Sequence, residues 1–179
     1  APDAKSLKDE VAALGADAVE DRAMTRFPHM EDGMPFLWDY QIKGFCKDAC
    51  KMMRYSSDSA SKKVTNYLKK IDGCIFPSPR KIALHVPEGM DIGSCQRPLR
   101  AQTAMGERIA LANSEELPAG TWCDFKLSTL IEDAQTQKAI IEWFQSGFLR
   151  GIGQWRNSGK GRFGCVVKRD GKVLLDTLH

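Results

Sequence analysis

The sequence predicts a mixed α+β fold with one antiparallel sheet and two packed helices. Apolar residues recur at steps of three and four over residues 39–55 and 132–147, which is the spacing of amphipathic helices. They alternate with polar residues over residues 79–87 and 121–131, as in half-buried strands. Helix, strand, strand, helix and a last strand, in this order, are five of the six elements of a ferredoxin-like unit. The first strand of that unit is missing or irregular in this sequence.

The length of 179 residues suits a single domain. In residues 1–40 we expect a helix over residues 5–20 and then an irregular segment that turns at Asp32-Gly33. Residues 41–179 hold the ferredoxin-like elements. Between their first two strands lies a long loop, residues 87–120, and loops of this length are commonly functional or disordered.

The second predicted helix and the end of the chain carry clear local signals. The core face of this helix is expected to consist of Ala139, Ile140, Trp143 and Phe144. Gly147 follows as its expected C-cap. A glycine-rich loop comes next, and residues 162–175 then predict a hairpin that turns at Asp170-Gly171.

Charge is distributed unevenly along the chain, although its net value is only +3. Residues 1–39 and 111–146 carry −5 and −4, whereas residues 40–110 and 147–179 carry +7 and +5. Such a surface attracts phosphate polymers, and ordinary solvated charge is an equal alternative at this point. We expect a soluble, cytoplasmic protein without a membrane partner, because no apolar run could span a bilayer and no signal peptide is evident.

The six cysteines lie in helix-like and strand-like segments, which is typical of reduced cysteines in a core. Cys46 and Cys50 are one helical turn apart, but no second pair has the spacing that would complete a zinc site. The histidines share no motif, and His85 falls inside a predicted strand. We therefore expect no metal, no other cofactor and no catalytic residue.

The strongest candidate site is the stretch GIGQWRNSGKGRFG, residues 151–164, with five glycines, three cationic residues and no acid. Glycines permit positive φ, so that consecutive N–H groups can face one anion, and arginine can hold phosphate through two bonds. Alternatively, the glycines let the loop pack closely and Trp155 fills the core instead of stacking on a base. The residues assigned here to nucleic-acid binding are Gly151, Gly153, Gln154, Trp155, Arg156, Asn157, Ser158, Gly159, Lys160, Gly161 and Arg162.

A second candidate site is the start of the first predicted helix. If this helix begins near Gln41, its positive dipole end and Lys43 point toward the same anion, and Gly44 lets a phosphate approach. Lys47 lies one turn further along, in a basic stripe that continues to Arg54. A solvated basic face, with Gly44 as a packing contact, is an equal alternative.

The third candidate is the long loop, whose cationic and polar tips could lie over a nucleic-acid strand. Its members are Arg97, Arg100, Gln102, Thr103 and Arg108. The alternative is a surface loop in which the arginines pair with Glu107, Glu115 and Glu116.

Three stretches together resemble the RAMP superfamily, the RRM-like RNA-binding subunits of CRISPR effector complexes. They are GMPFLWDYQIKGFCKDA, ELPAGTWCDFKLSTL and the glycine-rich loop. The segment RPLRAQTAMGERIALANSE is in addition similar to phage-encoded relatives of that superfamily. The resemblance implies an RRM-like fold and RNA binding. It also implies assembly along the strand or with subunits of a CRISPR-type complex, in the host cytoplasm if the protein is phage-encoded.

These observations lead us to expect a non-catalytic protein that binds single-stranded nucleic acid, RNA rather than DNA. One alternative is an endoribonuclease of RAMP type, in which Asp32 and Asp39 would be loop acids at a metal. The other alternative is a phage inhibitor or assembly module that acts through protein–protein contact.

Overall fold

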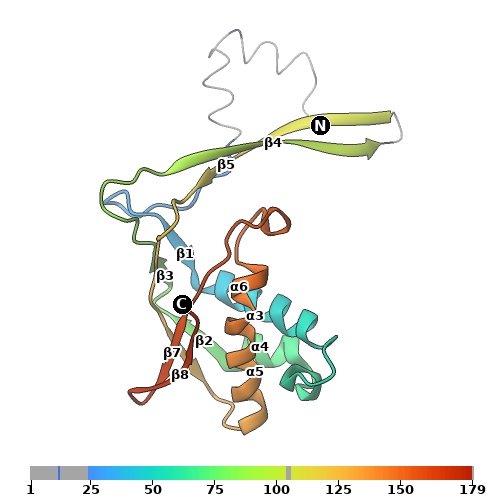
Figure 1. The fold of residues 1–179 in the computed structure, drawn as a ribbon, viewed down its shortest axis with the longest axis vertical. Helices are drawn as coiled ribbons and strands as arrows, with labels where there is room; N and C mark the ends of the chain where they lie inside the picture. Colours follow the sequence, from blue (N-terminus) through green and yellow to red (C-terminus); the bar gives the residue numbers. More distant parts are fainter. Residues whose placement is uncertain (1–11, 13–23, 104–105, 179) are drawn as a thin grey trace. The chain divides into compact units, whose positions relative to one another are not determined.

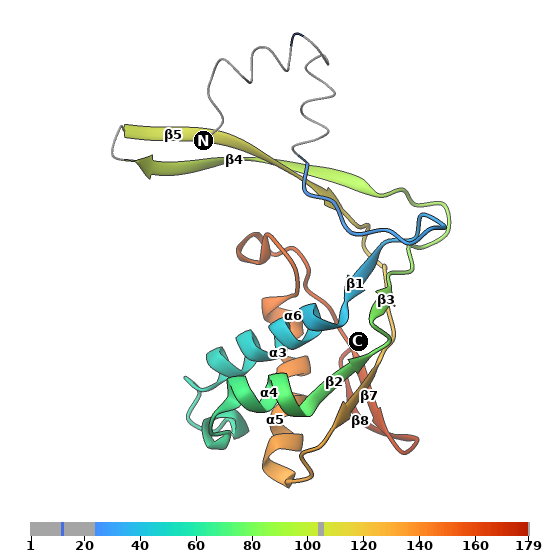
Figure 2. The ribbon, with the colours of Figure 1, turned by 180° about the vertical axis from the view of Figure 1, so that it is seen from behind.

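In a computed structural model the chain is divided into two compact units, coloured along the sequence in Figure 1 and seen from behind in Figure 2. The first unit consists of Ala1–Phe36 and Ala83–Cys123. The second consists of Leu37–Ile82 and Asp124–His179. The chain therefore leaves the second unit once, after Ile82, and returns to it at Asp124.

The structure describes residue 12, residues 24–103 and residues 106–178, with the backbone alone for residues 99–103 and 107–110. The helix expected over residues 5–20 lies outside the described residues, apart from Ala12. Among the residues that are described, no helix is both long enough and apolar enough to cross a membrane.

The fold is mixed α+β, as the sequence predicts. The strands in the described part of the chain form four two-stranded sheets: β1 (Phe36–Trp38) with β3 (Lys81–Ala83), β2 (Ile75–Ser78) with β6 (Lys126–Thr129), β4 (Gly93–Thr103) with β5 (Gly106–Glu116), and β7 (Val166–Arg169) with β8 (Lys172–Asp176). The pairs β2–β6, β4–β5 and β7–β8 are antiparallel. The single larger sheet expected from the sequence is not present among the described strands.

Strand β1 directly precedes the first packed helix, so a strand is present there and is not missing, but with three residues it is short, in keeping with the alternative of an irregular first strand. Its three residues follow a proline and are too few for an alternating pattern to be recognised. The backbone of β1 runs antiparallel to β3, because Leu84 N–H donates to Pro35 O and Asp39 N–H donates to Arg80 O, both at 2.9 Å. A helical crossover in a βαβ unit joins parallel strands, so this pairing departs from that pattern.

The second unit contains helices that gather beside strands β2, β7 and β8 (Figures 1 and 2). They are α3 (Asp39–Met53), α4 (Tyr67–Cys74), α5 (Ala134–Gln145) and α6 (Gly147–Arg150), together with the 3₁₀ turns η1 (Ala60–Lys63) and η2 (Arg156–Ser158). The predicted core face of α5 is confirmed, because Ala139, Ile140, Trp143 and Phe144 are all buried. Asp133 caps α5, since its carboxylate accepts hydrogen bonds from the N–H (2.8 Å) and the hydroxyl (2.7 Å) of Thr136.

The core of the second unit is built around aromatic rings. The ring of Phe45 on α3 lies 5.6 Å from that of Phe144 and 5.4 Å from that of Phe163. Trp143 is fully buried, and its indole N–H donates to Ser61 Oγ at 2.8 Å. Glu142 accepts a hydrogen bond from Ser59 Oγ at 2.7 Å. These contacts attach turn η1 to helix α5.

Gly147 does not cap helix α5, contrary to the prediction from the sequence. Ser146 is the C-cap, Gly147 begins α6, and Gly151, with φ +67°, follows the end of α6. A side chain at position 147 would overlap the ring of Phe163. The glycine is therefore required for close packing and not for a left-handed backbone.

The prediction of an irregular loop over residues 87–120 is also wrong, because most of this segment forms the antiparallel hairpin β4–β5. Its register runs from Gly93 opposite Glu116 to Thr103 opposite Gly106. The N–H of Thr25 donates to Asn113 O and the N–H of Glu115 donates to Thr25 O, so an N-terminal segment adds to the edge of β5. Apolar and polar residues do not alternate in this segment, and the backbone ladder forms without that signal.

Turns at Asp-Gly pairs are predicted correctly. Asp170 and Gly171 have φ of 51° and 77° between β7 and β8, as a two-residue hairpin turn requires. Gly33 has φ +84°, and its N–H donates to Met30 O at 3.0 Å.

Replacing Gly147 by alanine is expected to lower the free energy of unfolding by about 1–3 kcal/mol, because the new methyl group must displace the ring of Phe163. Gly44→Ala is the matched control. Position 44 lies within α3, and an added Cβ would meet no atom within 4 Å, so this change should stabilise the protein by about 0.5–1 kcal/mol. Urea unfolding followed by circular dichroism measures both effects. Equal stability of Gly147→Ala and the wild type would contradict the packing described.

Candidate nucleic-acid interface

The glycine-rich loop, residues 151–164, extends from the end of α6 in the second unit (Figure 1). Its glycines Gly151, Gly153, Gly159 and Gly161 all have positive φ, between 67° and 86°, as the sequence suggested. The loop is closed by its own backbone, because Ile152 N–H donates to Gly161 O at 2.8 Å. Turn η2 occupies its middle, where the N–H groups of Ser158 and Lys160 both donate to Trp155 O.

Two of the glycines serve this closure. A Cβ on Gly151 would lie 2.7 Å from the carbonyl of Gly161, and a Cβ on Gly161 would overlap the carbonyl oxygen of Ile152. The alternative considered from the sequence, that glycine permits close packing, thus holds at these two positions. Gly153 has no atom within 4 Å of an added Cβ, so only its backbone conformation requires glycine.

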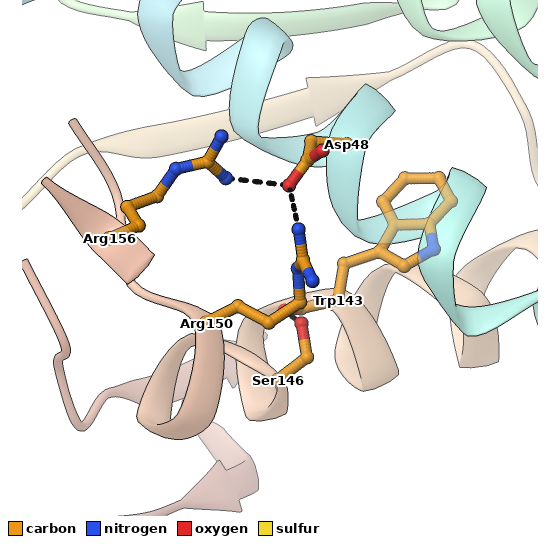
Figure 3. A network of polar contacts seen from close by, with 5 residues as sticks. All are labelled: Asp48, Trp143, Ser146, Arg150 and Arg156. Atoms are coloured by element: carbon orange, nitrogen blue, oxygen red, sulfur yellow. Dashed lines mark hydrogen bonds and ion pairs between the residues drawn. The ribbon is translucent and has the colours of Figure 1, made fainter. Parts of the chain in front are cut away.

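Arg156 is held by a carboxylate on helix α3. Figure 3 shows Arg156 and Arg150 converging on one oxygen of Asp48, with N–O distances of 2.6 and 2.9 Å. Burial alone would raise the pKa of Asp48, but the hydrogen bonds and charges of the two arginines outweigh this effect and lower the pKa from its ordinary value of 3.8. We call these three residues the Asp48 clasp. It attaches the end of α6 and the middle of the loop to α3.

Phe163 holds the other end of the loop, and sequence reasoning missed it. Its ring packs edge-on against Phe45, and its N–H donates to Gly147 O at 3.3 Å. The only available signal was an aromatic residue inside a glycine-rich stretch. Trp155, in contrast, is half-buried and has a left-handed backbone with φ 59°.

The remaining loop side chains differ in exposure. Gln154, Asn157, Ser158 and Arg162 are exposed, whereas Lys160 is half-buried. The guanidinium group of Arg162 lies over Gly159. The loop therefore presents one exposed and one half-buried cation beyond the Asp48 clasp.

The start of α3 differs from the expected anion site. The helix begins at Asp39, two residues before Gln41, and places a carboxylate in its first turn. Lys43 Nζ donates to Asp72 O at 2.8 Å and lies 4.9 Å from the centre of the Phe76 ring. Lys47 forms an ion pair with Asp72 at 2.5 Å, and Gly44 is exposed. Lys43 and Lys47 therefore connect α3 to the end of α4.

The polar residues of the long loop lie on hairpin β4–β5, in the first unit, whereas the glycine loop and Lys43 belong to the second. Arg97 is exposed and pairs in register with Ala112. Arg100 is opposite Ile109, Gln102 is opposite Glu107, and Arg108 is opposite Ala101. Of the glutamates proposed as partners, Glu115 accepts a hydrogen bond from Phe27 N–H at 2.7 Å.

A further group of cations and aromatic rings was not assigned from the sequence. Lys51, Arg54, Tyr55 and Tyr67 line a cavity of about 250 Å³ where α3 ends and α4 begins. Lys51 and Arg54 belong to the basic stripe that the sequence indicates. The signal for the rest was the tyrosines that follow this stripe, one directly after Arg54 and one at the start of the next helix.

Groups considered for metal or acid–base chemistry have structural partners. Asp32 accepts the N–H of Met34 at 3.0 Å, and Asp39 accepts that of Tyr40 at 2.9 Å. His85 stacks on Trp122 with ring centres 4.1 Å apart. Burial raises the pKa of Cys46 to about 12, so its thiol is protonated at neutral pH. Within residues 24–103 and 106–178 no three His, Cys, Asp or Glu side chains gather to form a metal site.

Comparison of the chain with models of protein families, with curated proteins and with solved structures finds no match. The function is therefore inferred from the residues of the chain itself.

The Asp48 clasp predicts a pH-dependent contribution to stability. Asp48→Asn should lower the free energy of unfolding at pH 7 by about 1–2 kcal/mol, because two charge-assisted hydrogen bonds are lost in a partly exposed position. The pKa of Asp48 is depressed in the folded state, so the stabilisation is complete above the unfolded pKa of 3.8 and is lost as pH falls through the lower folded pKa. Chemical denaturation of both proteins between pH 7 and pH 2 should show the gap closing below pH 4.

Asp170→Asn is the control for this change. Its carboxyl is almost fully exposed in the β7–β8 turn, and asparagine tolerates the same left-handed backbone. This variant should match the wild type across the pH range. A gap for Asp48→Asn that persists undiminished at the lowest pH would rule out the ionic contribution.

Proposed function

We propose that the protein is a non-catalytic binder of single-stranded nucleic acid, RNA in preference to DNA. The observation that carries the proposal is the glycine loop, a closed and anchored projection that presents cations outward. The Asp48 clasp and Phe163 anchor it to the rest of the unit, and Arg162, directly before Phe163, is exposed. Cations on a pre-ordered support lose little conformational freedom when they bind phosphate.

The charge balance around the clasp supports the same proposal. Arg150 and Arg156 share a single carboxylate, so the clasp keeps a net charge of +1. Lys160 and Arg162 follow within six residues of Arg156 and add to it. An arginine that donates one bond to Asp48 still has further N–H donors for a phosphate oxygen.

We also propose that the protein belongs to the RAMP superfamily, as its sequence motifs suggest. Elements β1, α3, β2, β6, α5 and β7 follow one another in the order of a ferredoxin-like unit, with α4 inserted before β2, and β3 and hairpin β4–β5 inserted before β6. The antiparallel pairing of β1 with β3 would be a departure particular to this chain. The resemblance favours RNA, assembly along the strand or with CRISPR-type subunits, and action in the cytoplasm of a host cell.

A protein-contact function is the second candidate, and exposed apolar side chains favour it. On α6, Phe148 and Leu149 are 59% and 69% exposed. Val173 and Leu174 on β8 are also exposed. A protein that remains free of nucleic acid but forms salt-resistant oligomers would fit this second candidate better.

The loop is tested by replacing two of its cations with neutral residues of similar size. Lys160→Gln with Arg162→Gln should weaken binding to a single-stranded RNA oligomer at least 10-fold and reduce the slope of log K against log salt by about 1.4, because about 0.7 counterions are released per phosphate contact. Fluorescence anisotropy over a range of salt concentrations measures both quantities. Arg156 is left intact in this test, since its loss would also break the Asp48 clasp.

The matched control is Lys168→Gln with Lys172→Gln on hairpin β7–β8, which removes the same charge from exposed positions of the same unit. This control should bind as the wild type does. Equal weakening by both double variants would mean that net charge, and not the loop, controls affinity, and would contradict the proposal.

Tighter binding to a DNA oligomer of the same sequence would overturn the preference for RNA, and cleavage of labelled RNA would overturn the non-catalytic role.

A further inference from the structure

The segment from α3 to α4 is the most cationic part of the second unit. Residues 43–70 contain eight basic residues and two acidic ones, a net charge of +6. One of these acids, Asp48, is already bound by two arginines from outside the segment. The electric field of residues 43–70 therefore attracts anions near the end of α3 more strongly than the net charge of +6 suggests.

At the end of α3, cations and aromatic rings line one cavity. Lys51 lies in the last turn of α3, and Arg54 is the C-cap of that helix. Tyr55 follows with 80% of its surface exposed, and Tyr67 begins α4. Together they line an open hollow with a volume of about 250 Å³. An exposed tyrosine at one site is ordinary, whereas two tyrosines beside two cations at one hollow are a specific combination.

The walls of this cavity are held in place by the rest of the unit. Arg54 donates to Val64 O at 2.8 Å, and its guanidinium lies 5.4 Å from the centre of the Tyr67 ring. The segment that joins the two tyrosines includes η1, which is attached to α5 through Ser61 and Trp143. Arg54 and the ring of Tyr67 are thus positioned before any ligand arrives, which lowers the entropic cost of binding.

The combination of groups and the size of the cavity define the class of ligand. Base–aromatic stacking suits any nucleobase, and Lys and Arg suit a phosphate. A volume of about 250 Å³ is smaller than the roughly 300–1,000 Å³ of pockets that enclose a small molecule. It is enough for one base with its phosphate while the remainder of the ligand stays outside.

We propose that this cavity binds one nucleotide, with its base against the tyrosine rings and its phosphate at Lys51 and Arg54. The identification of this nucleotide as a unit of a bound strand rests on the proposed function. The binding chemistry itself does not depend on the glycine loop, since none of the residues that line the cavity belongs to that loop.

The test is an NMR titration of the full-length protein with AMP, adenosine, inorganic phosphate and an adenine tetraribonucleotide. AMP should bind more tightly than either adenosine or phosphate alone, with shifts at Tyr55 and Tyr67. Tyr55→Ala should weaken AMP and tetranucleotide binding about 5-fold or more, whereas Tyr55→Phe should keep it, because the ring stacks in both cases. Tyr55 is largely exposed, so its replacement should leave the fold intact.

The charge requirement is tested by Lys51→Gln, which should weaken AMP binding about 3-fold or more while leaving adenosine binding unchanged. Lys138→Gln, at an exposed position of α5, is the matched control and should have no effect. Equal affinity of wild type and Tyr55→Ala would overturn the inference. Phosphate binding as tight as that of AMP would leave an anion site only and would overturn it too, as would no Tyr55-dependent signal with either AMP or the tetranucleotide.

Failure of this inference is distinguishable from failure of the proposed function. If strand binding depends on Lys160 and Arg162 but not on Tyr55, the loop proposal stands and the nucleotide cavity is excluded. If binding depends on Tyr55 but not on the loop cations, the cavity stands and the glycine loop is excluded.

Discussion

The packing of Trp143 between helix α5, helix α3 and turn η1 is the contact on which both candidate sites depend. Its indole is fully buried and has a single directed hydrogen bond, to Ser61 Oγ. A buried indole N–H without a partner costs about 1–3 kcal/mol, so this bond selects one arrangement of η1 against α5. That arrangement places Tyr55 and Tyr67 at the two ends of a fixed segment. Ser146, which precedes α6, donates its hydroxyl to Trp143 O at 2.6 Å, and Arg150 at the end of α6 reaches Asp48.

The same side chains cannot serve folding and ligand binding to an equal extent. Lys43 and Lys47 bind Asp72, and Arg156 binds Asp48. A phosphate that approaches these cations competes with partners that are already present at close range. The cationic candidates that contribute least to holding the fold are therefore Arg162 on the glycine loop and Lys51 at the end of α3, both of which are exposed. On helix α3, the candidate phosphate-binding cation is therefore at the end of the helix and not at its beginning.

Much of the second unit was predictable from the sequence because its elements carry local signals. Helices α3 and α5 have apolar faces at helical spacing, and the turn at Asp170-Gly171 has the residues that a two-residue hairpin needs. Strand β2 was missed because Pro77 lies within it, although Ile75 and Pro77 are buried and alternate with exposed residues. The hairpin β4–β5 was missed for another reason, since its stability comes from the backbone ladder and not from a periodic apolar face.

The candidate site was predictable only in its residue types. The sequence indicates a basic stripe and a glycine-rich loop, but the partners of their side chains depend on tertiary contacts. Asp48 and Asp72 determine which cations are engaged, and nothing in the local sequence marks either residue as a partner. Gly147 shows the same limit, because its position before a loop suggested a cap. Its function follows from Phe163, sixteen residues further along the chain.

The hydrogen bonding of the glycine loop determines what kind of recognition the proposed function would involve. Anion-binding loops of the nest type hold phosphate through consecutive backbone N–H groups. Here the N–H groups of Ile152, Ser158 and Lys160 donate to carbonyls of the loop itself. Phosphate would therefore be held mainly by charged side chains. Salt screens such contacts strongly, and they do not distinguish one base sequence from another. Discrimination of RNA from DNA would then require contacts to the 2′-hydroxyl, and stacking on tyrosine would add affinity that every base can supply.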